Sequence, residues 1–318
     1  MKTKSLLVAA TVALFSPFIF AENAKPNVIL IMADDLGWGD TGFNGSKVIK
    51  TPHLDQMAAE GLQLDRFYSA SSVCSPTRAS VLTGRNPYRT GVPTANQGFL
   101  RPEEIVLPEV LKEQGYATGH FGKWHLGSAV TSSPSSNGFD FNDGNTNNSD
   151  GNQGGTVQTD PKKIFELTTK SIEFIQNAVN DGVPFALQLS HYAVHSDIEA
   201  RQETIDLYND EAQRPIGTRH DNVEYAAMTE DTDDGLGLLL DEITNLGLDS
   251  NTYVIFVSDN GGQMNFTDNS PLSFGKTFIK LRFKLVLPLA GTVSLIKSLC
   301  CQTPSISILL RSTSKPMS

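Results

Sequence analysis

A lone cysteine, Cys74, stands at the start of a predicted helix, with an arginine four residues later. No other cysteine occurs among the first 299 residues of this 318-residue chain. Ser75 is a favourable N-cap, Pro76 suits the first helical position and Gly84 supplies a stop, so the segment predicts a loop followed by a short helix. Arg78 can fold back over the face that carries Cys74, where the helix N-terminus offers unpaired amide protons. The segment therefore predicts an anion site with a candidate nucleophile inside it.

Acidic side chains follow two separate apolar runs that are typical of buried parallel strands. Asp34 and Asp35 follow the run NVILIMA, and Asp259 and Asn260 follow the run TYVIFV after one serine. Because ligands collect at the carboxyl ends of parallel strands, both pairs can converge on one point. Three carboxylates and one amide oxygen are hard ligands suited to Ca²⁺ or Mg²⁺. The alternative is that these side chains only cap loops, which Asp and Asn commonly do.

Basic side chains follow two further predicted strands. Lys123 and His125 lie two residues apart, a spacing that lets both point the same way in an extended segment. His191 and His195 follow the apolar run FALQL. An isolated histidine is more often structural than catalytic, but two histidine-bearing segments and a lysine at strand ends indicate a functional site.

These strands alternate with patterns typical of helices. The predicted helices cover residues 51–60, 103–114, 161–180 and 223–246, the last with an interruption near Gly235 and Gly237. Residues 128–160 are rich in Ser, Asn, Gly, Asp and Thr and predict a long surface loop. Alternating strands and helices predict an α/β fold, with a mostly parallel central sheet flanked by helices on both faces.

Composition constrains the cellular location and the partners. Residues 1–21 predict a secretory signal peptide, because Lys2 and Lys4 precede an apolar run too short to span a bilayer. We therefore expect a mature protein without a stable membrane span that is exported, either to the periplasm or into the medium. The net charge of −10 argues against nonspecific binding to nucleic acid or to an anionic membrane surface. Three cysteines, two of them adjacent, give no disulfide framework.

Four motifs occur together in the order and spacing of one enzyme family. They are NVILIMADDLGWGD, CSPTRASVLTGR, GKWHLG and SDNGG. From about Pro26 to Lys276 the chain resembles the formylglycine-dependent sulfatases, the arylsulfatase family of the alkaline phosphatase superfamily. In that family the cysteine of Cys-x-Pro-x-Arg is oxidised to an aldehyde whose hydrate attacks sulfate. The resemblance implies an alkaline-phosphatase-like fold, a sulfated carbohydrate or aryl sulfate as substrate, and a formylglycine-generating or sulfatase-maturing enzyme as a partner.

The resemblance also implies which side chains bind a metal ion. Asp34, Asp35, Asp259 and Asn260 match the family positions that hold a divalent cation, usually calcium. Residue 74, as a formylglycine hydrate, would complete the metal shell through one hydroxyl and attack sulfur with the other.

The same resemblance assigns other side chains to the nucleophile, the sulfate group and the leaving alcohol. Arg78 would steady the hydrate, and Lys123 would contact both the hydrate and a sulfate oxygen. His125 would act as base when the sulfated intermediate collapses. His195 matches the family position that protonates the leaving alcohol, and Lys276 resembles the second sulfate-binding lysine.

The chain departs from the family pattern after Lys276. Residues 277–318 contain no acidic residue and carry the adjacent pair Cys300 and Cys301. We expect residues 22–276 to form the N-terminal part of the sulfatase catalytic domain and residues 277–318 to be an atypical basic tail. The family's smaller C-terminal subdomain is missing, which indicates a truncation or a frameshift just past Lys276.

The sequence leaves two alternatives to an active sulfatase. One is a truncated, inactive remnant or a protein that binds sulfated glycans without turnover. The other is a phosphodiesterase or phosphonate hydrolase of the same superfamily, because those enzymes share the metal ligands and sometimes the formylglycine.

Overall fold

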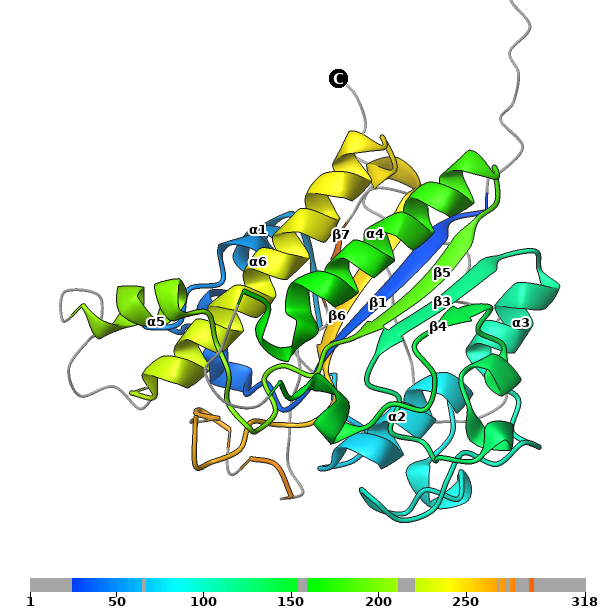
Figure 1. Ribbon diagram of the computed structural model, residues 1–318, viewed down its shortest axis with the longest axis horizontal. Coiled ribbons are helices and arrows are strands. Elements are labelled where there is room, and N and C mark those ends of the chain that lie inside the picture. The colour runs from blue at the N-terminus through cyan, green and yellow to red at the C-terminus, as the bar shows by residue number, and fades with distance from the viewer. Residues whose placement is uncertain are drawn as a thin grey trace, which may run out of the picture.

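A seven-stranded sheet forms the centre of the protein (Figure 1). The computed structural model describes residues 25–64, 67–153, 159–210, 221–267, 269–272, 275–277 and 286–288. The strands of the sheet are β1 (Asn27–Ala33), β2 (Gly61–Gln63), β3 (Ala117–Gly122), β4 (Phe141–Asn142), β5 (Phe185–Ser190), β6 (Thr252–Ser258) and β7 (Val286–Pro288). Their order across the sheet is β2-β7-β6-β1-β5-β3-β4.

The direction of the strands confirms the prediction of a mostly parallel sheet. β1 runs parallel to β5 on one side and to β6 on the other, and β3 runs parallel to both β5 and β4. Only β7 reverses direction, since it pairs antiparallel with β6 and with β2 at one edge. The carboxyl ends of β1, β3, β5 and β6 therefore meet at the same edge of the sheet.

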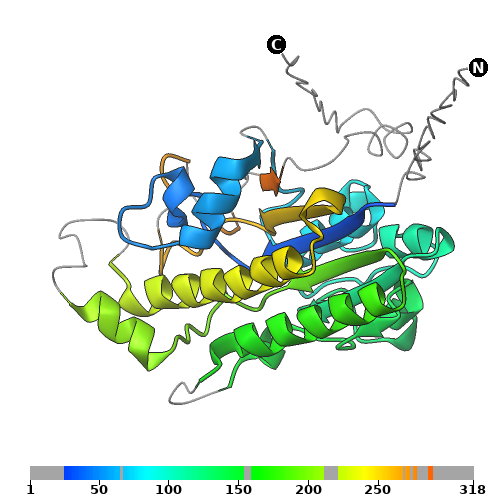
Figure 2. The same cartoon turned by 90° about the horizontal axis from the view of Figure 1, so that it is seen from above.

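Helices lie on both faces of this sheet, as predicted. The helices are α1 (Pro52–Glu60), α2 (Cys74–Thr83), α3 (Leu107–Glu113), α4 (Ile164–Asn180), α5 (Gln202–Asn209) and α6 (Val223–Asn245). Short 3₁₀ turns lie at Trp38–Asp40, Gly42–Asn44, Pro87–Arg89, Val130–Ser132, Ser135–Asn137, Asn148–Gly151, Pro161–Lys163 and Asp249–Asn251. α4 and α6 run side by side along one face (Figure 1), and α2 lies on the opposite face (Figure 2).

The side chains of β1 show why its sequence is apolar throughout. Ile29 and Ile31 belong to the large cluster that joins the sheet to α4 and α6. Leu30 and Met32 point to the other face and pack in a second cluster with Val81 of α2. Because both faces of the strand are buried, polar residues cannot alternate with apolar ones along it.

The predicted interruption of the last helix is wrong. α6 runs without a break from Val223 to Asn245 and includes Gly235 and Gly237. A side chain at Gly235 would meet Ile164 of α4 at 2.7 Å, and one at Gly237 would meet the ring of His53 at 2.5 Å. These glycines allow close packing between helices, and the packing offsets their low helix propensity.

Two other predicted helix starts also need correction. α2 begins at Cys74 with Val73 as its N-cap, and the Ser75 hydroxyl caps nothing. Pro76 still fits, since backbone amides of the first helical turn need no partner within the helix. The helix predicted from residue 103 begins only at Leu107, where Pro108 occupies the first turn.

Several elements were not predicted. They are the two edge strands β2 and β4, the strand β7 next to β2, and the helix α5, all short. β4 and three of the 3₁₀ turns lie inside the segment 128–160, which was predicted to be a surface loop. β7 lies inside the segment predicted to be an atypical tail, and it pairs with both β6 and β2.

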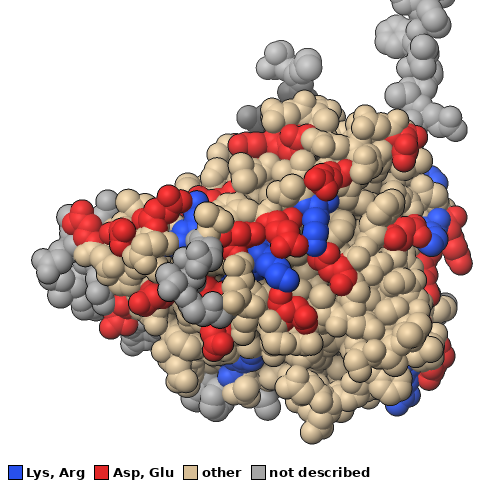
Figure 3. Space-filling view, in the orientation of Figure 1, with Lys and Arg blue, Asp and Glu red and all other residues tan. Residues whose placement is uncertain are grey.

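Some predictions fall on residues that the structure does not describe. The signal peptide of residues 1–21 and the pair Cys300 and Cys301 lie outside the described residues. Among the described residues, no helix combines the length and the apolar character needed to cross a membrane. Acidic side chains gather over α5 and α6 on the face shown in Figure 3, which would repel anionic polymers there.

Candidate active site

Four polar side chains meet where β1 and β6 end. Ala33 pairs with Ser258 in the parallel register of the two strands, so Asp34 and Asp259 follow at neighbouring positions. The Asp259 amide donates to the Ala33 carbonyl at 3.0 Å, and the Asp35 amide donates to Asp259 Oδ1 at 3.2 Å. Asp34, Asp35, Asp259 and Asn260 are all buried. The strand register alone thus brings the two halves of the predicted metal site together.

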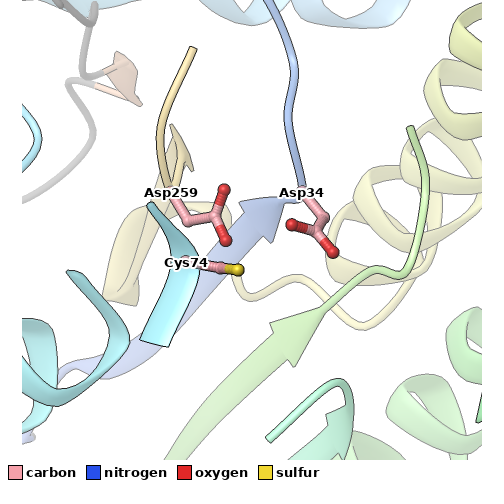
Figure 4. A group of neighbouring side chains, drawn as sticks. All are labelled: Asp34, Cys74 and Asp259. Carbon is pink, nitrogen blue, oxygen red and sulfur yellow. The ribbon is translucent and has the colours of Figure 1, made fainter. Parts of the chain in front are cut away.

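Cys74 approaches this group from the first residue of α2 (Figure 4). Its Sγ points toward the carboxylates of Asp34 and Asp259, and the three side chains offer ligand atoms within 4.8 Å of one another. Cys74 is buried and carries a free thiol. The candidate nucleophile therefore lies at the predicted metal site.

Arg78 lies one turn after Cys74 and connects α2 to residues that follow β1, β3 and β6. Its Nε and Nη2 donate to Asp259 Oδ2 at 3.1 and 2.8 Å, and its Nη1 donates to the Lys123 carbonyl at 2.7 Å. Its Nη2 also lies 3.6 Å from Asp34 Oδ1. Burial lowers the pKa of Arg78, but Asp259 and Asp34 raise it by more, so the net shift is upward and the guanidinium stays charged.

Two lysines complete the charged cluster. Lys123 is fully buried and donates from Nζ to Asp34 Oδ2. Lys276 Nζ donates to Asp35 Oδ2 at 2.6 Å, and Asp35 raises the pKa of Lys276 although burial opposes this. Three carboxylates thus face three fixed cations: Asp34, Asp35 and Asp259 with Arg78, Lys123 and Lys276.

This arrangement perturbs the two central carboxylates in opposite directions. Burial raises the pKa of Asp34, but Lys123 and Arg78 lower it by more, so Asp34 remains ionised. Burial and the neighbouring Asp34 raise the pKa of Asp259, although Arg78 and Lys123 oppose the shift. A bound cation would favour the ionised form of both groups.

Two buried oxygens support a metal ion in this pocket. Asp34 Oδ1 and Asn260 Oδ1 have no hydrogen-bond partner among the described residues. An unpaired buried oxygen costs about 1–3 kcal/mol, so such an atom calls for a ligand or an ion. Carboxylate and amide oxygens are hard donors that fit Ca²⁺ or Mg²⁺, whereas the Cys74 sulfur is a soft donor that fits neither. All ligand atoms of the site are hard donors only if residue 74 offers an oxygen in place of its sulfur.

The unmodified thiol is a poor nucleophile in this position. Burial raises the pKa of Cys74, and the carboxylates of Asp34 and Asp259 raise it further, with Lys123 opposing them. Since the thiolate is the reactive form of cysteine, the side chain stays largely unreactive as a thiol.

The histidines differ in their relation to the pocket. His125 Nε2 lies 2.9 Å from Asn96 Oδ1, and burial lowers the pKa of His125 to about 3, with Lys123 and Arg78 adding to the shift. His195 Nε2 lies 3.6 Å from Asp35 Oδ2. His191 is fully buried, and neither of its ring nitrogens has a hydrogen-bond partner among the described residues. The structure thus associates His125 and His195, but not His191, with the charged cluster.

One local prediction about this segment is wrong. The extended conformation expected from Lys123 to His125 ends at His125, whose φ is 58°. The Gly122 amide donates to Asp143 and the His125 amide donates to the Thr146 carbonyl, so residues of the segment 128–160 shape this backbone.

Sequence reasoning missed two side chains of the site. Gln263 Nε2 donates to Asp35 Oδ2 at 2.9 Å and lies 3.4 Å from the Ser196 hydroxyl, beside His195. Asn96 contacts His125, as described above. Gln263 follows the SDNGG motif directly and could have been suspected from that position. Asn96 lies in a turn far from any motif, so no sequence signal marks it.

Comparison with known proteins identifies the class. The model of the Sulfatase family matches residues 26–286. N-acetylgalactosamine-6-sulfatase of Mus musculus is 33% identical over 287 residues, which cover 79% of this chain and 53% of that protein. The ulvan-active sulfatase of Formosa agariphila is 31% identical over 272 residues, covering 79% of this chain and 53% of that protein. The chain belongs to the sulfatase family.

Solved structures agree with this assignment. The crystal structure of Ps i-CgsB in complex with k-i-k-neocarrahexaose has a TM-score of 0.73 at 28% identity, covering 84% of this chain and 68% of that one. A member of the alkaline phosphatase superfamily from Vibrio parahaemolyticus has a TM-score of 0.56 at 20% identity, and it supports the fold alone. This likeness agrees with the predicted alkaline-phosphatase-like fold. The chain spans about half the length of the curated relatives it matches.

Proposed function

We propose that this protein hydrolyses sulfate monoesters of sulfated carbohydrates, with residue 74 oxidised to formylglycine as the nucleophile. The observation that carries this proposal is the position of Cys74 among Asp34, Asp259 and three fixed cations. The substrate class is supported by the names of the relatives, an N-acetylgalactosamine-6-sulfatase and an ulvan-active sulfatase, and by the complex of Ps i-CgsB with k-i-k-neocarrahexaose.

The chemistry of a sulfate monoester explains why this pocket suits it. The oxygens of the ester repel a nucleophile, so the reaction needs positive charge near the sulfate oxygens. Asp34, Asp35, Asp259 and Asn260 would hold Ca²⁺, or Mg²⁺ in its place, and the bound cation would stabilise the negative charge that develops on the sulfate group. Lys123 and Lys276, now paired with carboxylates, would also contact sulfate oxygens. Since the three carboxylates balance the three fixed cations, binding of a divalent cation and a singly charged sulfate monoester would leave a net charge of +1, which favours the negative charge that develops on the sulfate group.

The first step is transfer of the sulfate group to residue 74. One hydroxyl of the formylglycine hydrate would give its proton to the neighbouring carboxylate of Asp259 and attack sulfur, while the bond from sulfur to the alcohol oxygen breaks. His195 lies beside Asp35 and would give the leaving alcohol its proton. Arg78 would hold residue 74 in place, since it lies one turn further along α2 and is fixed by Asp259.

The second step releases sulfate without attack of water at sulfur. His125 would take a proton from the remaining hydroxyl of residue 74, the carbonyl group forms again, and the bond from carbon to the sulfate oxygen breaks. Sulfate leaves with the electron pair of that bond. A serine or a thiol lacks the second hydroxyl, so neither could follow this route.

Further proposals concern maturation, location and the extent of the catalytic part. A sulfatase-maturing enzyme of the host would oxidise Cys74 and supply the oxidant. The protein would be exported, to the periplasm or into the medium, because its first residues resemble a signal peptide. Residues 22–276 would form the catalytic part, and the frameshift proposed after Lys276 can be tested by resequencing the gene and reading the other two frames.

The deciding experiment uses the full chain produced together with a maturing enzyme. Mass spectrometry of the peptide that contains residue 74 should show the aldehyde, and the protein should hydrolyse aryl sulfate and sulfated oligosaccharides in the presence of Ca²⁺. Cys74→Ala serves as the inactive control. A modified, folded, Ca²⁺-loaded chain that turns over no sulfate ester would favour the inactive or glycan-binding alternative. Faster hydrolysis of an aryl phosphate diester would favour the phosphodiesterase.

A further inference from the structure

His125 is held by a side chain that none of the motifs includes. Asn96 Oδ1 lies 2.9 Å from His125 Nε2. The loop that carries Asn96 is fixed to the histidine segment nearby, because the Leu100 amide donates to the Leu126 carbonyl at 2.8 Å. This backbone hydrogen bond keeps the loop of Asn96 next to the segment of His125.

Both residues adopt the left-handed backbone conformation. φ is 58° at His125 and 65° at Asn96. Residues other than glycine seldom adopt this conformation, although Asn and His do so more often than most, and the surrounding structure must hold them there. Residues in such conformations cluster at functional sites, which agrees with a functional role of the His125 ring.

The partner on Nε2 determines which ring nitrogen carries the proton. Asn96 Oδ1 can only accept a hydrogen bond, so Nε2 must be the donor. Burial keeps the pKa of His125 at about 3, so the ring is neutral and its other nitrogen, Nδ1, has a free lone pair. Nδ1 is buried and has no hydrogen-bond partner among the described residues. A buried acceptor without a partner suits an atom that receives a proton during the reaction.

We propose that Asn96 is a positioning residue that fixes His125 in the tautomer with hydrogen on Nε2, so that Nδ1 is the atom that accepts the proton in the sulfate-release step. The inference rests on the proposed function for the identity of that step. There, Nδ1 takes the proton of the remaining hydroxyl of residue 74 as the carbonyl forms and sulfate departs with the bonding electrons.

The tautomer can be measured without any turnover. Long-range ¹H–¹⁵N spectra of the full chain labelled in histidine distinguish the two ring nitrogens, and His125→Gln assigns the signals by their loss. The wild type should show hydrogen on Nε2 only. Asn96→Ala should give a mixture of tautomers, whereas Asn96→Asp should keep the wild-type tautomer because a carboxylate oxygen also accepts. Gln97→Ala, an exposed change in the same turn, should have no effect.

Kinetics of the matured enzyme give the second readout. Asn96→Ala should slow sulfate release about 10-fold, less than the about 100- to 10,000-fold contribution of a general base because His125 itself remains, while leaving the transfer of sulfate to residue 74 nearly unchanged. Sulfated protein should then accumulate during turnover and be visible in the intact mass. Asn96→Asp should recover part of the release rate.

The possible results separate the two proposals. Hydrogen on Nδ1 in the wild type, or an unchanged tautomer in Asn96→Ala, overturns the role of Asn96 whatever the activity. If the wild type lacks turnover, the proposed function fails, and the spectra still decide whether Asn96 fixes the ring.

Discussion

Replacing the side-chain nitrogen of Asn260 with an oxygen, in the variant Asn260→Asp, tests the charge balance of the pocket. Asn260 Nδ2 donates to Asp35 Oδ1 at 2.5 Å and to the Gly261 carbonyl at 3.1 Å. Asn260→Asp keeps the shape of the side chain but replaces this donor with an anionic oxygen that faces Asp35. Four carboxylates would then face three fixed cations. We expect the variant to be unstable without a divalent cation and to depend on it more strongly than the wild type.

The expected size follows from the contacts. A hydrogen bond to a charged acceptor contributes about 1.5–3 kcal/mol, and its loss leaves two buried carboxylates in contact. Removing the compensation of a buried charge costs about 3–5 kcal/mol, unless the new carboxyl takes up a proton. We therefore expect a loss of at least about 3 kcal/mol, which corresponds to a fall in Tm of about 6–12 °C for a domain of this size. A bound cation would contact the same oxygens and cancel most of this loss.

The assay is thermal unfolding of both proteins with a chelator and with excess Ca²⁺. The variant should melt well below the wild type with the chelator, and Ca²⁺ should raise its Tm by more. Asn145→Asp is a matched control, because Asn145 also donates to backbone carbonyls but is exposed. Equal stability of Asn260→Asp and the wild type with the chelator, or an equal Ca²⁺ shift in both, would refute the reasoning.

Three further predictions concern single side chains. Arg78→Met removes three hydrogen bonds and leaves Asp259 without its ion-pair partner, so urea unfolding should show that the free energy of unfolding falls by about 3–5 kcal/mol. Arg78→Lys should lose less, and a loss below about 1 kcal/mol in Arg78→Met would contradict the pairing. Burial raises the pKa of Asp233 from 3.8 to about 7, so the folded state holds the proton more tightly and the free energy of unfolding should fall as pH rises across that interval. If Asp233→Asn shows the same pH dependence, another group causes it. His195→Gln should reduce kcat/KM about 100-fold on sulfated sugars but much less on sulfates of acidic phenols, because an acidic phenol can leave without a proton. Equal losses on both substrates would exclude a role of His195 in protonating the leaving group.

The sequence determined the main strands and the edge of the sheet where the charged residues meet. The runs before Asp34 and Asp259 are apolar throughout, which predicts strands buried on both faces, and parallel strands place their carboxyl ends together. The spacing of Cys74 and Arg78 likewise follows from one turn of helix, although the helix begins one residue earlier than the expected N-cap. These features depend on local patterns, so they could be read without the fold.

Only the tertiary structure decided which partners the charged groups take. The contact of Lys276 with Asp35 joins residues 241 positions apart, and the contact of Asn96 with His125 joins two loops. The same holds for α6, which continues through Gly235 because α4 packs against it there. Such contacts depend on the register of the strands and on the packing of distant segments, and no local propensity specifies either of these.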